Sequence, residues 1–346
     1  MTIRLGILGA VHSHLTGKVR AIASGAAGDV EIAGVFEANP SIRSQREADP
    51  AYGSVRWVPR AEDLLADDTI QGIIIDGEIW QFLGDAKQAL LAGKHVYLEK
   101  PAGTSLEEYR EVLDLAASRQ LVVMMAYHFR NSPSSQLLYR VARAGILGDV
   151  FSIRGRIGKP KASFDRWMDN MPYPGHIMFE MCGHLIDPMI AVLGRPQRVT
   201  PFLRSDFRRP ESGAGPIILP ARGIPGEDAD RPFVDNSLAV LEWDRAMAIV
   251  EAAAMEVGAQ RRLELLGTKG TLVIEPPGST QARLHLEEAA GEFQQGWQTV
   301  DGGDWTAFSQ DLRDLAAAIR GERMPAFGPV HDFIVQETLL RAAGVL

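Results

Sequence analysis

Three polar side chains have the type and spacing that proton transfer requires. Lys100 directly follows a short apolar segment, and Glu180 and His184 are four residues apart in a segment with helical periodicity. Residues four apart lie on one face of a helix, so a carboxylate there can orient an imidazole that titrates near neutral pH. Asp187 follows near the same stripe. Oxidation of a secondary alcohol needs such a base together with a hydride acceptor.

A turn that could hold the acceptor precedes the first expected helix, in the stretch GILGAVHSHL. Of the three glycines of a dinucleotide-binding turn it has only Gly9, with Val11 and His14 in the other two places. An anion can still bind where the helix begins after Ser13, and Val11 leaves N–H donors that point toward it. A protonated His12 or His14 would add a contact, which predicts tighter binding in mild acid.

A carboxylate, Glu37, ends the second apolar segment, VEIAGVF. At that place a carboxylate can accept hydrogen bonds from both hydroxyls of an adenosine ribose and repel a 2′-phosphate. The sequence therefore predicts NAD as the cofactor, with NADP less favoured.

The elements that position these side chains alternate between strand and helix in the first third of the chain. The apolar segments predict strands at residues 3–8, 30–36, 55–58, 70–75, 95–98 and 122–126. Helical spacing falls between them, at residues 15–23, 81–92 and 109–118. This order predicts an α/β fold with a doubly wound parallel sheet, whose ligand crevice lies at the carboxyl ends of the strands.

The remainder of the chain predicts an α+β domain with an open, mostly antiparallel sheet. Strands are expected at residues 150–157, 238–243, 246–252, 262–266, 271–275 and 283–287, with a hairpin turn at GTKG, and helices at 135–144, 177–193, 306–320 and 332–343. Residues 205–236, rich in proline and glycine, predict a long loop. The expected domains are residues 1–126, which bind the dinucleotide, and residues 127–346, which bind the substrate.

Composition excludes several classes of function. The formal net charge is −8 and no long basic run occurs, which argues against nucleic-acid binding. The single cysteine, Cys182, excludes an intrachain disulfide and a CxxC metal site. No apolar run reaches the length of a membrane span. These features, with a start that runs from MTIRL into the turn, predict a cytoplasmic protein without membrane contact.

Several motifs resemble one family of oxidoreductases. They are AGKHVYLEKPAG at residues 92–103, YHFRNSP at 127–133, AGILGDV at 144–150 and EMCGHLID at 180–187. Together they are similar to the family of glucose-fructose oxidoreductase, inositol dehydrogenase and rhizopine-catabolism proteins (Gfo/Idh/MocA), over roughly residues 1–200. The resemblance implies a Rossmann domain, a second domain whose open sheet face mediates oligomerisation, and NAD(P)-linked oxidation or reduction of sugars and cyclitols.

The resemblance and the spacing together give the candidate site residues. Lys100, Glu180, His184 and Asp187 are expected to be catalytic, with Lys100 and His184 in proton transfer. The residues expected to bind the cofactor are Gly9, Val11, His12, Ser13, His14, Glu37, Glu78, Trp80, Glu99, Lys100, Pro101, His128 and Arg130. A homodimer or homotetramer is expected through the apolar sheet face, with Leu238, Val240, Leu263 and Leu265 as candidates.

Departures from the family pattern leave other interpretations open. Glu180 stands where the family usually has aspartate, and GEIWQF at residues 77–82 replaces a threonine-proline pair with a later histidine. One alternative is a metal-dependent lyase or hydrolase with His12, His14 and Glu78 as ligands. Another is a non-catalytic sensor that binds a sugar or nucleotide. The basic residues Arg154, Arg156, Lys159, Lys161 and Arg166 make an acidic sugar a further option.

Overall fold

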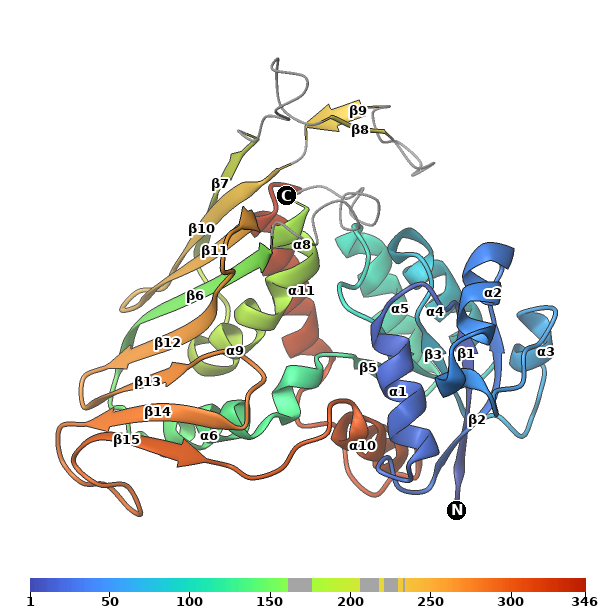
Figure 1. Ribbon diagram of the computed structural model, residues 1–346, viewed down its shortest axis with the longest axis horizontal. Coiled ribbons are helices and arrows are strands. Elements are labelled where there is room, and N and C mark those ends of the chain that lie inside the picture. The colour runs from blue at the N-terminus through green and yellow to red at the C-terminus, as the bar shows by residue number, and fades with distance from the viewer. Residues whose placement is uncertain (161–175, 206–217, 221–229, 233) are drawn as a thin grey trace. The chain divides into compact units, whose positions relative to one another are not determined.

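The computed structural model describes residues 1–160, 176–205, 218–220, 230–232 and 234–346 (Figure 1). Contacts within the chain divide it into two compact units. The first comprises Met1–Asn131 and Thr306–Phe333, and the second comprises Ser132–Trp305 and Ile334–Leu346. The chain therefore returns to the first unit near its end. The expected functional boundary between residues 126 and 127 stays a prediction, because contacts do not report which residues bind a ligand.

The first unit contains a five-stranded parallel sheet in the order β2-β1-β3-β4-β5. Its strands are β1 (Ile3–Leu8), β2 (Val30–Phe36), β3 (Gly72–Ile75), β4 (His95–Leu98) and β5 (Val123–Met125). They are short and apolar because a parallel sheet is covered on both faces. The predicted parallel sheet is confirmed.

The strand expected at residues 55–58 does not form. The segment makes an isolated bridge between Val35 and Trp57, supported by two backbone hydrogen bonds of Val35. Pro59 follows at once, and a residue without an N–H cannot continue a ladder. The prediction was wrong because the apolar pattern of four residues did not take account of the proline.

Helices cover both faces of this sheet. Those of the first unit are α1 (His14–Ala23), α2 (Pro40–Glu47), α3 (Glu62–Leu65), α4 (Phe82–Leu91), α5 (Leu106–Ser118) and α10 (Ser309–Ile319), with single turns η1 (Pro50–Tyr52), η2 (Ile79–Gln81) and η3 (His128–Asn131). Leu5 and Ile7 of β1 pack in one core with Leu15 of α1 and Leu312 of α10. On the opposite face, Gly6 lies against Leu64 of α3. Thus α10, from the end of the chain, packs beside α1.

The second unit contains an eight-stranded sheet in the order β15-β14-β13-β12-β6-β11-β10-β7. Its strands are β6 (Val150–Pro160), β7 (Arg198–Arg204), β10 (Asn236–Glu242), β11 (Met247–Glu256), β12 (Arg261–Gly267), β13 (Gly270–Ile274), β14 (Gln281–Leu286) and β15 (Gly296–Asp301). All neighbours are antiparallel except β6 and β11. The expected mostly antiparallel sheet and its hairpin between β12 and β13 are confirmed, while the edge strands β7 and β15 were not predicted. A separate short ribbon pairs β8 (Ile218–Pro220) with β9 (Asp230–Pro232).

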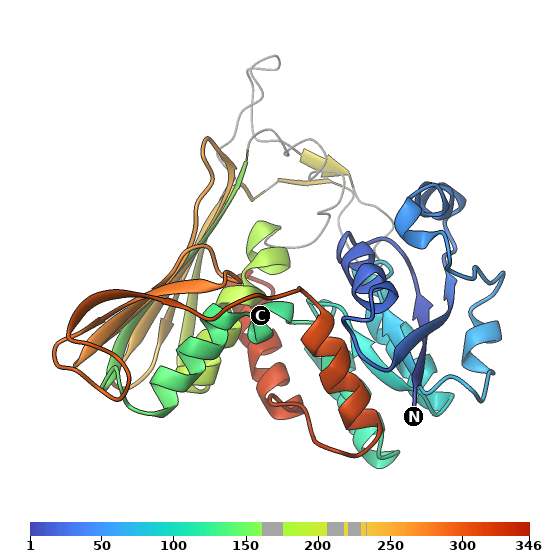
Figure 2. The same ribbon diagram turned by 60° about the horizontal axis from the view of Figure 1, so that its bottom comes forward.

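Helices of the second unit lie on one face of the large sheet (Figure 2). They are α6 (Pro133–Arg143), α8 (Ile177–Met181), α9 (Gly183–Leu193) and the later part of α11 (Pro329–Ala342). Leu263 and Leu265 are buried toward these helices, so their expected place on the open face is wrong. Leu238 and Val240 alternate with buried residues of β10 and do lie on the other face.

That other face carries both apolar and charged side chains. Phe202 is 55% exposed and pairs in register with Leu238. Arg156 forms ion pairs with Glu251 and Glu256 and alternates with the buried residues of β6. These two carboxylates balance the charge of the guanidinium, so Arg156 is accounted for without an acidic sugar. Lys161 and Arg166 lie outside the described residues.

In the part of the chain that the structure describes, helices long and apolar enough to cross a membrane do not occur.

Candidate active site

The turn between β1 and α1 is held by neighbouring strands. The Gly9 N–H donates to the Phe36 carbonyl (2.8 Å), and the Val11 N–H donates to the Asp76 carbonyl (3.0 Å). The Ala10 N–H donates to the Glu37 side chain at 2.6 Å. The expectation that Val11 points its N–H toward an anion is therefore wrong. Ser13 is an exposed residue where α1 begins, and its N–H is the candidate donor instead.

Gly9 keeps its place in the turn for a steric reason. Its φ is +83°, and a Cβ atom there would lie 2.1 Å from the Cα of Gly77, which follows β3. A side chain at this position is excluded by both the backbone conformation and the contact. The absence of a side chain at Gly9 therefore allows the ends of β1 and β3 to lie in contact.

Arg46 of α2 binds carbonyl groups of this turn. Its guanidinium donates to the carbonyls of Ala10 (2.9 Å), Val11 (3.1 Å) and His12 (3.1 Å). It also donates to the Thr16 hydroxyl at 3.3 Å. These bonds fix the turn and place a positive charge at it. Sequence reasoning missed Arg46, because one arginine in the polar segment SIRSQRE resembles an ordinary surface residue.

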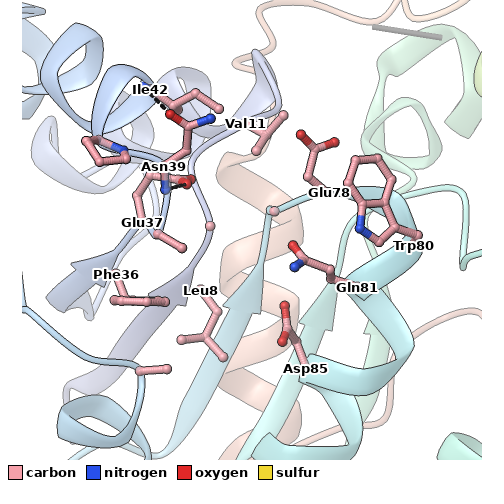
Figure 3. Close-up of a pocket in the computed structure, with 15 residues that line it drawn as sticks. Leu8, Val11, Phe36, Glu37, Asn39, Ile42, Glu78, Trp80, Gln81 and Asp85 are labelled. Carbon is pink, nitrogen blue, oxygen red and sulfur yellow. Dashed lines mark hydrogen bonds between the residues drawn. The ribbon is translucent and has the colours of Figure 1, made fainter. Parts of the chain in front are cut away.

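A cavity of about 570 Å³ opens at the carboxyl ends of β1, β2 and β3 (Figure 3). Glu37 is buried at its wall, and one carboxylate oxygen accepts the Asn39 N–H at 2.7 Å. Glu78 and Asp85 also line the cavity, and burial raises the pKa of Asp85 to about 6. Among the described residues that line it, Lys, Arg and His do not occur. The wall thus carries carboxyl groups that can accept hydrogen bonds.

A buried ammonium group lies next to this turn. Lys18 of α1 is fully buried, and its Nζ lies 2.5 Å from Asp76 Oδ2 and 2.5 Å from Glu99 Oε2. Burial lowers the pKa of Lys18, but the two carboxylates outweigh burial and raise it. Burial raises the pKa of Asp76 to about 7, whereas Lys18 and the neighbouring histidines bring the pKa of Glu99 well below its usual value despite burial. Lys18 is therefore a cation and Glu99 an anion at neutral pH.

Three histidines gather beside this pair of charges. The His14 ring is 4.1 Å from that of His12 and 4.7 Å from that of His128, measured between centroids. His14 Nδ1 lies 3.1 Å from Glu99 Oε1. Burial lowers the pKa of all three imidazoles. Burial thus disfavours the protonated form on which the predicted phosphate contact of His12 or His14 depends, and that contact stays a prediction.

The other residues expected on the cofactor side are also in the first unit. Lys100 is buried and its N–H donates to Glu99 Oε1 at 3.2 Å; the Lys100–Pro101 peptide bond is cis. Trp80 lines the cavity with Glu78. Arg130 pairs with Asp332 at 2.5 Å. Its charge is therefore balanced within the protein.

In the second unit, the expected helix over residues 177–193 is divided. Glu180 lies in α8, whereas His184 and Asp187 lie in α9, with the break at Cys182. Gly183 begins the second helix, and a glycine disfavours helix continuation. Glu180 is half-buried, and His184 and Asp187 are buried. The argument that one continuous helix aligns Glu180 with His184 is therefore wrong.

The parallel sheet, with a cavity at its carboxyl edge and a carboxylate after β2, defines a dinucleotide-binding α/β fold. Residues 3–127 match the oxidoreductase family with an NAD-binding Rossmann fold, and residues 135–273 match the GFO/IDH/MocA C-terminal domain. The chain belongs to the Gfo/Idh/MocA family of oxidoreductases.

Relatives and solved structures agree with this assignment. An uncharacterised oxidoreductase of Schizosaccharomyces pombe is 29% identical over 253 residues, which cover 70% of this chain and 63% of that protein. Levoglucosan dehydrogenase of Pseudarthrobacter phenanthrenivorans is 24% identical over 313 residues, 86% of this chain and 78% of that protein. The structure of a levoglucosan dehydrogenase in complex with NADH and levoglucosan superimposes with a TM-score of 0.77 at 17% identity, over 99% of this chain and 98% of that chain. The chain thus spans less than two thirds of the first of these relatives.

The Lys18 network yields a prediction about stability. Lys18→Met leaves Asp76 and Glu99 buried without their cation, so the free energy of unfolding in urea should fall by about 3–5 kcal/mol. The control Lys87→Met breaks an exposed pair with Glu111, and such pairs contribute at most about 1 kcal/mol. Equal denaturation midpoints for the two variants would show that the buried network does not stabilise the unit.

Proposed function

We propose that this protein is an NAD-dependent dehydrogenase that transfers a hydride between the cofactor and a secondary hydroxyl of a sugar, sugar derivative or cyclitol. The observation that carries the proposal is the cavity at the carboxyl edge of the parallel sheet, with Glu37 at its wall. The family match and the likeness to levoglucosan dehydrogenase support the reaction and the substrate class.

The residues around the cavity fit a dinucleotide at its adenosine end. Each Glu37 oxygen accepts one backbone N–H, and a carboxylate oxygen has a second lone pair that can accept a ribose hydroxyl. Glu78 and Asp85 add negative charge to the same wall, which favours NAD over NADP. Ser13 at the start of α1 would lie next to the pyrophosphate, and Arg46, which binds the carbonyl groups of the turn, adds a positive charge there.

When bound, NAD supplies the hydride acceptor. In this proposal Lys100 and His184 move the proton of the substrate hydroxyl, and Glu180 and Asp187 orient the groups that do so. Glu99 accepts the Lys100 backbone N–H, and so fixes the chain at the catalytic lysine. Burial lowers the pKa of His12, His14 and His128, which favours their neutral forms near that lysine.

The test is turnover of NAD with a panel of sugars, anhydrosugars and cyclitols. Lys100→Ala and His184→Ala should each lower kcat by about 100-fold or more, as expected for a positioned acid or base, without loss of secondary structure. His285→Ala, on β14 of the second unit, is the matched control and should keep normal turnover. Near-normal turnover in both catalytic variants would refute the assigned roles.

The proposal includes a homodimer or a dimer of dimers through the open face of the large sheet. Phe202, Leu238 and Val240 contribute apolar side chains to this face, and an exposed apolar sheet face is typical of an interface. Phe202→Arg should shift the mass measured by light scattering at micromolar protein toward the monomer. The control is Phe151→Arg, which changes the same type of side chain, 48% exposed. In β6, Phe151 alternates with the residues of the open face and so lies on the opposite face of the strand. A monomeric parent protein would contradict the proposed assembly.

A further inference from the structure

Two histidines of the turn and one buried carboxylate converge beside β4. His12 and His14 come from the turn and the start of α1, and Glu99 directly follows Leu98 of β4. One donor atom from each of the three side chains lies within 4.8 Å of the others. Among the described residues, the carboxylate of this set is Glu99, whereas the sequence suggested Glu78 as the third ligand.

The chemical state of these groups suits a metal ion. An imidazole binds a metal in its neutral form, and burial lowers the pKa of His12 and His14 and so favours that form. Glu99 is fully buried and ionised, with Oε2 held by Lys18 and Oε1 toward His14. Its orientation is therefore fixed before any ion binds, as in sites whose outer contacts orient the ligands.

The charge balance of the pocket also permits a cation. Lys18 is one buried ammonium group, and Asp76 and Glu99 are two carboxyl groups that share it at 2.5 Å each. With both carboxyl groups ionised, this buried trio carries one excess negative charge. The positive charge of the Lys100 side chain, on the residue after Glu99, offsets this negative charge. The ion must therefore gain most of its affinity from direct bonds to nitrogen and oxygen.

We propose that His12, His14 and Glu99 bind a divalent transition-metal ion of the zinc or manganese type. Two imidazoles and a carboxylate are a donor set that such ions accept. In a tetrahedral site with bonds of about 2.0–2.2 Å, two ligand atoms lie about 3.3–3.6 Å apart, so binding requires rotation of the imidazoles toward the ion. Three protein ligands leave at least one coordination position for water or a bound oxygen ligand.

The inference does not rest on the proposed dehydrogenase activity, because metal binding is measured without nucleotide and without substrate. The protein is treated with a chelator, dialysed and titrated with Zn²⁺ in competition with a chromophoric indicator. One equivalent should bind per chain, with a dissociation constant on the order of 1 μM or tighter. A failed dehydrogenase assay with intact zinc binding would leave this inference standing.

Variants locate the site. His12→Ala and His14→Ala should each weaken zinc binding by about 100-fold or more, because each removes a direct ligand. Two controls should keep the parent affinity: His285→Ala, a histidine on β14, and Glu78→Gln, the carboxylate that the sequence suggested. Glu99→Gln also disturbs Lys18, so the histidine variants, checked by circular dichroism, decide the outcome. Absence of saturable binding up to about 100 μM Zn²⁺, or parent affinity in both histidine variants, would overturn the proposal.

Discussion

The buried ammonium group of Lys18 is the interaction on which the arrangement of the first unit's site depends. It joins α1 to the ends of β3 and β4 through Asp76 and Glu99. A buried charge without a partner is costly, so the three elements can pack only in a geometry that keeps these contacts. Glu99 in turn orients His14 and accepts the backbone N–H of Lys100. One cation thus sets the relation between the turn and the residue proposed to be catalytic.

A second set of contacts explains how a turn with few glycines keeps its shape. Gly9 remains because its neighbour Gly77 leaves no space for a Cβ atom. The N–H groups of Ala10 and Val11 are bound by Glu37 and the Asp76 carbonyl, and Arg46 binds three carbonyl groups of the turn. Because these N–H groups are bound within the protein, the turn offers an anion fewer donors than a glycine-rich turn does. Binding of a pyrophosphate must then rely on Ser13, the dipole of α1 and nearby charge.

Much of the fold and part of the site could be predicted from the sequence. Short apolar segments between helical ones predicted the parallel sheet, and the position of Glu37 after β2 placed a carboxylate at the cavity. The segment 55–58 and the helix over 177–193 failed because a proline and a glycine change the chain over one or two residues. One proline or glycine changes the hydrophobic periodicity of a segment very little, so periodicity does not reveal where an element ends.

Lys18 and Arg46 were missed for a different reason: their roles arise from contacts with residues far away in the sequence. Arg46 binds carbonyl groups of a turn that is separated from its own helix by α1 and β2. Lys18 did leave a signal, since it lies on the same helical stripe as Leu15 and Ile22, where a charged residue needs a buried partner. The sequence alone does not show that Asp76 and Glu99 are those partners.

The central claim is that this turn and the cavity beside it hold NAD in preference to NADP. Calorimetric titration of the parent protein with each nucleotide tests it most directly, with Glu37→Gln as the paired variant. The account predicts one equivalent of NAD per chain, NADP binding weaker by about tenfold or more, and a smaller difference between them in Glu37→Gln, where one repelling charge is lost. Absence of saturation by either nucleotide at about 1 mM, or tighter binding of NADP, would contradict it.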